Sequence, residues 1–375
     1  VPTVDEVPVS GTTFSAMDIT QVVNVAMDGW VTEGQYAKAF AAKLARFTGI
    51  PRVTLCNSGS SANLLAVTAL VDLYGTPKNS LIVTSALAFP TTVAPIMQNG
   101  MIPYFIDIDL QTLNPNTDNL VELANNPKVG GIILAHTLGF PYDEKAVVEA
   151  FGEAGKWVIA DCADALGALI KDNLHVGKYA DAATFSFFPA HHISAGEGGA
   201  VACHHAKLHE LIHQYSNWGR SCNCSPGEDN KCGKRFSHEY PHLPFGYDHK
   251  YVFSKIGYNL KITDLQAALG SSQMDRVHEM VMKRKSNYAY LMMKLREIPL
   301  FDNYFYTVKV PVGFSSSPFG FPITIKNTKV NRLELVKFLD DRKIRTRPIF
   351  SGNITRHPMM EHINYMSNGA LNNCD

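Results

Sequence analysis

The residues with the most chemical content lie between positions 184 and 201, TFSFFPAHHISAGEGGAV. A short apolar run ends at Pro189, two histidines follow at His191 and His192, and a glycine-rich stretch leads into another apolar run. An imidazole takes up and releases protons near neutral pH. His191 is therefore the leading candidate for a catalytic base, and His192 is a candidate substrate contact.

A polar turn separates a short buried strand, expected at 52–56, from a helix expected at 62–73. Glycine lets the backbone approach an anion, the start of a helix offers free N–H groups, and hydroxyls add donors. The candidate phosphate-binding residues in this turn are Ser58, Gly59, Ser60 and Ser61. A plain helix cap made of polar residues explains the same pattern, so the turn alone leaves both interpretations open.

Two carboxylates and one aromatic residue are further candidates. Asp161 closes the apolar run 157–161, and Asp164 follows in the same stretch. A buried carboxylate is unfavourable unless it is paired, and the protonated ring nitrogen of a cofactor would pair it. A capping role for Asp161 is the alternative. Phe89, beside Pro90, offers an aromatic face that could stack on such a ring or simply pack in the core.

Three of the seven cysteines, an odd number, lie in one short loop with the spacing Cys222-x-Cys224-x7-Cys232. Cysteines grouped in this way are typical ligands of soft metal ions. The N-terminus lacks the basic-then-apolar pattern of a secretion signal. We therefore expect cytosolic thiols or metal ligands rather than a disulfide framework.

The composition predicts a globular cytoplasmic protein. The 375 residues are 46% hydrophobic and 18% charged, with a formal net charge of zero and no long basic run. This balance argues against nucleic acid as the main partner. No apolar run approaches the roughly 20 residues that would span a bilayer, so we expect no membrane association.

Short apolar runs alternate with helical stretches such as 144–154, which indicates an α/β fold with a mostly parallel sheet covered on both faces. The runs that we expect as strands are 52–56, 81–85, 104–107, 131–135, 157–161, 183–187 and 200–203.

Two domains are expected. The large domain, 1–280, begins with a helical segment and contains a loop rich in cysteine, glycine and proline at 219–250. A long helix is predicted from near 262 through the 280s. Strand and helix patterns from about 295 predict a small C-terminal α+β domain, 281–375.

The order of these motifs, together with 257–268 (GYNLKITDLQAA), resembles the DegT/DnrJ/EryC1/StrS family of fold-type I pyridoxal phosphate (PLP) enzymes, from about residue 15 to the end. The resemblance implies that Asp161 holds the pyridinium nitrogen and that Phe89 stacks on the ring. Ser186 would join the phosphate-binding turn. Asn259 resembles the residue that reaches the cofactor phosphate of a neighbouring subunit, which implies a homodimer with shared active sites.

In the aminotransferases of this family a lysine stands at the position of His191. An imidazole cannot form the stable imine that lysine forms with the cofactor aldehyde. This replacement is typical of sugar 3-dehydrases, in which pyridoxamine phosphate (PMP) is held without a covalent bond and the C3 hydroxyl of a 4-keto sugar leaves. The resemblance implies that His191 is the base and that Arg347 faces the sugar nucleotide, where a guanidinium binds phosphate bidentately.

The cysteine loop, with residues 244–251 and 257–259, is similar to that of the CDP-4-keto-6-deoxyglucose type of 3-dehydrase. That type carries a [2Fe–2S] centre on four cysteines and is reduced by an NADH-dependent iron–sulfur flavin reductase. It serves 3,6-dideoxyhexose synthesis for surface polysaccharides such as lipopolysaccharide O-antigen. The fourth cysteine of the type falls at Ala163 here, and the nearest thiol is Cys162.

Three alternatives remain open at this point. One is the cluster-free dehydratase of the GDP-4-keto-6-deoxymannose type, which uses PMP and glutamate. Another is a non-catalytic cofactor- or sugar-binding protein, and the last is an ordinary aminotransferase. Relatives also continue beyond the last residue here with another strand and helix, so we expect the small domain to lack them.

Overall fold

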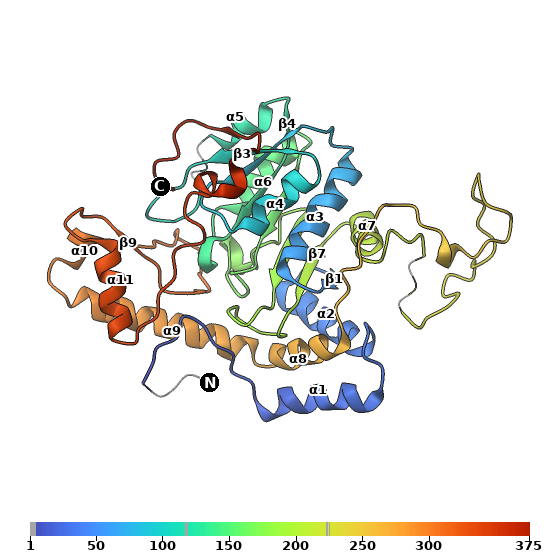
Figure 1. Ribbon diagram of the computed structural model, residues 1–375, viewed down its shortest axis with the longest axis horizontal. Helices are drawn as coiled ribbons and strands as arrows, with labels where there is room; N and C mark the ends of the chain where they lie inside the picture. The colour runs from blue at the N-terminus through green and yellow to red at the C-terminus, as the bar shows by residue number, and fades with distance from the viewer. Residues whose placement is uncertain (1–4, 116, 118, 223, 225) are drawn as a thin grey trace.

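The structure is a computed structural model that describes residues 5–115, 117, 119–222, 224 and 226–375. Its centre is an eight-stranded sheet with the order β1-β7-β6-β5-β4-β2-β3-β10 (Figure 1). Only β7 runs antiparallel to its neighbours, so the predicted mostly parallel sheet is confirmed. The strands are β1 (Arg52–Cys56), β2 (Leu81–Ser85), β3 (Ile102–Ile106), β4 (Val129–Ala135), β5 (Trp157–Asp161), β6 (Ala182–Ser186), β7 (Gly199–Cys203) and β10 (Met366–Ser367).

Helices cover both faces of this sheet. The central strands β2, β5, β6 and β7 are buried along their whole length, which explains their continuous apolar sequences. The helices up to residue 274 are α1 (Ala16–Asp28), α2 (Gln35–Thr48), α3 (Gly59–Tyr74), α4 (Pro90–Gln98), α5 (Leu120–Asn125), α6 (Glu144–Glu153), α7 (Ala206–Ser216) and α8 (Asp264–Met274).

The single long helix that we predicted from residue 262 is two helices, α8 and α9 (Val277–Arg296). The break falls at Asp275 and Arg276. Arg276 leaves helical geometry, with a φ of −116°, and its guanidinium pairs with the buried Asp18 of α1 at 2.6 Å. The helix is thus interrupted where Arg276 contacts α1, and no proline or glycine marks this break in the sequence.

The α9 helix leads to a smaller group of elements, drawn in orange at the left of Figure 1. They are α10 (Phe301–Tyr304), β8 (Phe305–Thr307), β9 (Ile323–Ile325) and α11 (Arg332–Asp341). The chain then returns to the large sheet, where β10 pairs with β3 and Cys374 packs against the core around Phe105. Sequence patterns assigned these last residues to the small domain because they carry no signal of their packing partner.

The segment between α7 and α8 protrudes from the body of the molecule at the right of Figure 1. Its described residues contain one short 3-10 turn, His249–Tyr251, and two isolated bridges near its base, Asn217–Asn259 and Arg220–Phe253. The predicted long loop therefore lies away from the sheet. Within the described part of the chain, no helix combines the length and apolarity needed to cross a membrane.

Candidate active site

A cavity of about 500 Å³ opens at the carboxyl ends of the parallel strands. Residues directly at or after the ends of β4, β5 and β6 line it, namely Ala135, Asp161 and Ser186. Ligands of open α/β sheets bind at this edge. The strand ends therefore bring together side chains that are far apart in the sequence, in a volume that suits a cofactor or a small ligand.

The polar turn before α3 forms one wall of this cavity. Ser58 is the N-cap of α3, and its hydroxyl accepts a hydrogen bond from the Ser61 backbone N–H at 3.1 Å. A Cβ at Gly59 would lie 2.5 Å from the Cβ of Ser186, so only glycine allows this close approach. The turn is a helix cap, and its residues Ser58, Gly59 and Ser60 also line the cavity at the helix N-terminus, where free N–H groups favour an anion.

Asp161 lies at the floor of the cavity in a network of hydrogen bonds. One carboxylate oxygen accepts from Asn63 Nδ2 and from Thr92 Oγ1, each at 2.8 Å, and the other accepts from the Ala163 N–H at 3.1 Å. Burial raises the pKa of Asp161, while these hydrogen bonds oppose the rise. A protonated ring nitrogen would stabilise this carboxylate, so the residues present fit a pyridoxal-type cofactor.

Asn63 and Thr92 are site residues that sequence reasoning missed. Both line the cavity, and Thr184 Oγ1 donates to Asn63 Oδ1 at 2.6 Å, which fixes the orientation of the amide. The available signal was Asn63 itself, a polar side chain in an otherwise apolar stretch of α3. Buried polar side chains of this kind need partners, and here the partner is Asp161.

His191 also lines the cavity, on the turn after β6. Its Nδ1 lies 3.2 Å from Asp164 Oδ1, at an angle that does not complete a hydrogen bond. The imidazole packs against Phe319, with ring centroids 5.3 Å apart. The second carboxylate oxygen of Asp164 is buried, and no described residue forms a hydrogen bond with it. Asp164 therefore lies against the imidazole without fixing it by a hydrogen bond, and its second oxygen is left to accept from a ligand.

The side chain of Arg284 on α9 connects the His191 turn to the segment around Phe319 through hydrogen bonds. Its guanidinium donates to the carbonyls of His191 at 3.0 Å and Ala190 at 3.3 Å, and on the other side to Phe319 at 2.8 Å. Burial lowers the pKa of Arg284, and the nearby Asp164 carboxylate opposes this shift. Sequence patterns gave no sign of this role, because it depends on backbone carbonyls from two segments.

The mouth of the cavity carries Phe89 and Arg347. Phe89 is 52% exposed, so its ring is free to cover a bound cofactor, in contrast to the core packing that we weighed as an alternative. Arg347 is exposed and donates to its own neighbour, the Thr346 carbonyl, at 3.0 Å. The wall thus offers an aromatic face and a cation to an anionic ligand.

Comparisons with known proteins agree with this arrangement. The profile of the DegT/DnrJ/EryC1/StrS aminotransferase family matches residues 13–375. The chain belongs to this family. The prediction of an enzyme on a fold-type I scaffold is confirmed by the match and by the structural neighbours.

Two curated relatives of this DegT-family chain cover nearly all of it. It is 45% identical to the lipopolysaccharide biosynthesis protein RfbH of Salmonella typhimurium, over 98% of this chain and 84% of the relative. It is 40% identical to the dTDP-4-dehydro-2,6-dideoxy-D-glucose 3-dehydratase of Saccharopolyspora spinosa, over 98% and 79%. Among solved structures, GDP-4-keto-6-deoxy-D-mannose-3-dehydratase of E. coli with bound hydrated PLP superposes with a TM-score of 0.87 at 25% identity, over 98% and 92%.

His192 does not reach the cavity, contrary to our expectation of a substrate contact. Its ring is buried, and its Nε2 lies 2.9 Å from the Ser317 carbonyl oxygen. Burial lowers the pKa of His192 well below its usual value, which favours the neutral imidazole. Adjacent side chains at this turn point in different directions, so in this DegT-family chain only His191 faces the site.

Asn259 lies outside the cavity of its own chain. It is exposed, and its side-chain oxygen accepts a hydrogen bond from Lys261 Nζ at 2.5 Å. Its predicted role, contact with the cofactor phosphate of a second subunit, concerns an assembly that a single chain does not test. That role stays a prediction.

Cys162 is not a partner of the cysteine loop. Its thiol is fully buried in the core, with Sγ 3.6 Å from the Ala160 carbonyl oxygen. Burial raises the pKa of the Cys162 thiol well above its usual value, and the Glu144 and Asp161 carboxylates raise it further. The predicted four-cysteine set is therefore not assembled in this chain, because successive residues at the end of β5 face opposite sides of the sheet.

Proposed function

We propose that the protein is a PMP-dependent 3-dehydrase that removes the C3 hydroxyl of a nucleotide-linked 4-keto-6-deoxyhexose. The observation that carries this proposal is the cavity with His191 at the place of the aminotransferase lysine. Among the described residues that line the cavity there is no lysine. A cofactor held there without a covalent bond, beside a histidine base, suits elimination rather than transamination by the usual route.

When bound, PMP supplies a primary amine that condenses with the sugar ketone and a ring that accepts electrons. The chain supplies the remaining functions. The turn from Ser58 to Ser61, with Ser186, would hold the phosphate, and Asp161 would hold the ring nitrogen. Phe89, at the mouth of the cavity, would cover the ring and exclude water. His191, with Asp164 beside its Nδ1, would accept a proton at its imidazole and return it to the departing hydroxyl.

The substrate class follows from the mouth of the cavity and from the relatives. Arg347 lines the cavity, and a guanidinium there supports binding of a diphosphate. The relatives with 45% and 40% identity are named for lipopolysaccharide biosynthesis and for 3-dehydration of a dTDP-linked sugar. We propose a CDP-linked substrate and a place in 3,6-dideoxyhexose synthesis, on the similarity of residues 219–259 to the CDP type.

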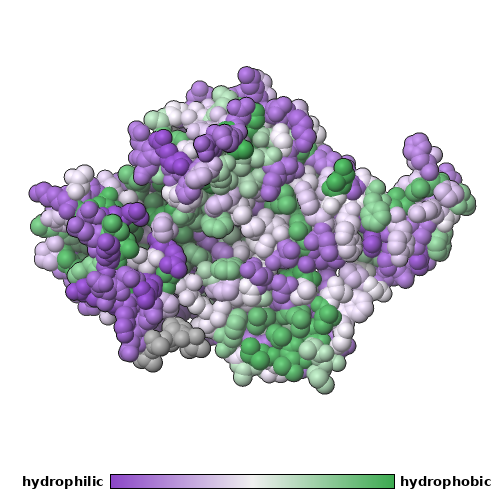
Figure 2. Space-filling model, in the orientation of Figure 1, coloured by the Kyte–Doolittle hydropathy of each residue, from purple (hydrophilic) through white to green (hydrophobic). Residues whose placement is uncertain are grey.

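The same similarity supports a reductase that supplies electrons, and a homodimer that completes each site. The exposed face of α1 favours the dimer. Apolar side chains gather at the bottom of Figure 2, where Figure 1 places α1. They include Met17, Ile19, Val23 and Met27, each more than half exposed. A contiguous apolar surface of this kind is typical of an interface, and we propose a second copy of this chain as its occupant.

A covalent trapping experiment tests the proposed function. The variant H191K, incubated with PLP and then with borohydride, should carry a phosphopyridoxyl group on residue 191, detected by peptide mass spectrometry. Wild type and H191N should remain unlabelled there. With PMP, reductase and a CDP-4-keto-6-deoxyhexose, wild type should release a sugar that lacks the C3 oxygen. An unlabelled H191K would overturn the placement of His191.

The source of electrons distinguishes the proposed reductase-coupled enzyme from the cluster-free alternative. If turnover requires glutamate and proceeds without any reductase, the GDP-type dehydratase is the correct function. If PMP and the sugar bind but no product forms with either reagent, the protein is a binding protein on this scaffold.

A further inference from the structure

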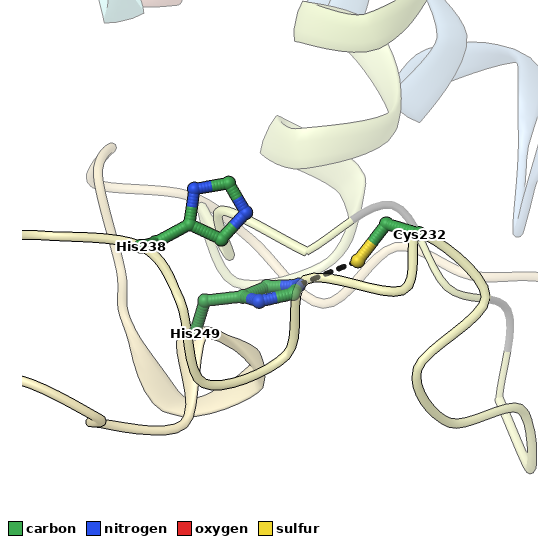
Figure 3. A group of neighbouring side chains, drawn as sticks. All are labelled: Cys232, His238 and His249. Carbon is green, nitrogen blue, oxygen red and sulfur yellow. Dashed lines mark hydrogen bonds between the residues drawn. The ribbon is translucent and has the colours of Figure 1, made fainter.

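The loop 219–250 contains a group of potential metal ligands that the cavity does not use. Cys232, His238 and His249 offer ligand atoms that all lie within 4.8 Å of one another (Figure 3). In Figure 3, the sulfur of Cys232 points toward the ring of His249, and the ring of His238 lies over it. The two imidazoles make an edge-on contact, with centroids 4.7 Å apart. Thiolate and imidazole together suit zinc, or iron in a sulfur centre.

The hydrogen bonds of His249 favour this role. Its Nδ1 lies 3.1 Å from the Arg235 carbonyl oxygen and 3.3 Å from the Lys234 carbonyl oxygen. Carbonyls only accept, so Nδ1 carries the proton and Nε2 keeps its lone pair. The Nε2 atom lies 3.8 Å from Cys232 Sγ. Metal-bound histidines are oriented by a carbonyl in this way, so His249 is preset as a ligand.

Two of the loop cysteines accept hydrogen bonds from backbone N–H groups. The Lys234 N–H donates to Cys232 Sγ, and the Cys224 N–H donates to Cys222 Sγ, both at 3.4 Å. Such backbone donors favour the thiolate, which is the form that binds metal. Burial raises the pKa of the Cys222 thiol, the hydrogen bond from the Cys224 N–H opposes this rise, and the neighbouring Cys224 and Cys232 add to it, so a bound cation would relieve the repulsion among the three sulfurs.

Ion pairs hold the ligand-bearing segments together without any metal. Arg235, three residues after Cys232, makes a forked contact with Asp248, with Nε at 2.9 Å and a terminal nitrogen at 2.6 Å from one oxygen. Lys250 pairs with Asp229. These contacts join residues 229–235 to 248–250, which brings His249 to Cys232 across 17 residues of chain.

We propose that histidine replaces the missing fourth cysteine, so that the loop binds a transition-metal centre through Cys222, Cys224, Cys232 and His249, with His238 beside them. The inference deepens the proposed function, since the reductase-coupled reaction needs a redox centre near this loop. It does not depend on Cys162, which the core sequesters. The ligand chemistry suits either a single ion or an iron–sulfur centre.

Metal binding by the full-length protein tests the proposal without any turnover. Protein purified anaerobically is analysed for zinc, iron and acid-labile sulfide, and the stripped protein is titrated with Co²⁺ alone, whose visible bands report thiolate and imidazole ligands. We expect one centre per chain. Loss of an outer-shell partner alone typically weakens metal binding about 10- to 100-fold, so H249A should weaken it at least about 100-fold. The matched control is H242A, an exposed histidine of the same loop.

The variants also identify the fourth ligand. H249C restores an all-cysteine set and should retain the metal while losing nitrogen coupling in pulsed EPR of the reduced iron or cobalt form. C162A should bind metal like wild type. Iron with equimolar sulfide would identify a cluster and support the redox role. Zinc alone would identify a redox-inert single-ion site, which keeps histidine ligation but overturns the link to the reductase-coupled reaction. Equal binding by H249A and H242A, loss of metal in C162A, or no binding at all would overturn the proposal. None of these results depends on the labelling of residue 191.

Discussion

The active-site cavity and the loop 219–250, which carries the candidate metal ligands, differ in how their residues are held in place. The cavity residues come from the whole sheet, and neighbouring elements fix them whether or not a ligand is bound. Asp161 is one example, since three donors from α3, α4 and its own turn hold it. The candidate ligands of the loop lie within 28 residues of sequence, from 222 to 249, on a segment with one short helical turn.

This difference indicates which site depends on its ligand. A site fixed by strands and a helix N-terminus is preorganised, so ligand binding costs little ordering. A loop held by ion pairs such as Arg235–Asp248 has its ligands near one another beforehand, and a bound metal would stabilise that arrangement further, because metal binding and folding are coupled. We therefore expect changes in the cavity to alter cofactor binding or catalysis and to leave the metal content of the loop unchanged.

The largest expected effect is that of D161N. Asparagine keeps the shape and can still accept from Thr92, but it removes the charge that pairs with a ring nitrogen. Charge-assisted hydrogen bonds are about twice as strong as neutral ones, so we expect PMP to bind about 100-fold more weakly. Fluorescence titration measures this affinity. Metal content should equal that of wild type, and a parallel loss of metal would show that the two sites are not independent.

The next effect concerns acid stability. Burial lowers the pKa of His175 to about 4, and the Gly167 N–H donates to its Nε2 at 2.8 Å, so the folded protein keeps this ring neutral. The unfolded chain binds a proton near pH 6.5. The stabilisation from the neutral ring is therefore complete above pH 6.5 and is lost as the pH falls from 6.5 toward 4.

The variant H175Q should remove the contribution of His175 to this dependence, because an amide oxygen can accept from Gly167 but does not titrate. His192 and His213, whose pKa values burial also lowers, keep their contributions. Linkage gives a difference of about 2 kcal/mol in the free energy of unfolding between pH 7.5 and pH 5. Urea unfolding at the two pH values measures it. H242Q, in the exposed loop, should retain the wild-type dependence. If H175Q loses as much stability in acid as wild type, His175 is not the group responsible.

The same contrast explains what the sequence could predict. The sheet, Asp161, the Ser58 turn and the place of His191 follow from local patterns, namely apolar runs with polar residues at their ends. His192 and Cys162 were misplaced because each is one position from a site residue, and one position reverses the direction of a side chain. Arg284 and His249 left no pattern, since their roles depend on carbonyls that only the folded chain brings near them.

The smallest expected effect belongs to Arg284, which links the two halves of the cavity wall. Its planar group reaches carbonyls of the His191 turn and of the Phe319 segment together. A lysine at this position has one ammonium and can donate to the carbonyls of only one of these two segments.

R284K should lower kcat about 10-fold, about 1.4 kcal/mol, through a misplaced imidazole, while the affinity for PMP stays unchanged. Steady-state kinetics and PMP titration separate the two. K283M, on the exposed side of the same helix turn, is the matched control. A rise in KM with constant kcat would instead make Arg284 a binding residue, because the imidazole would then be correctly placed without it.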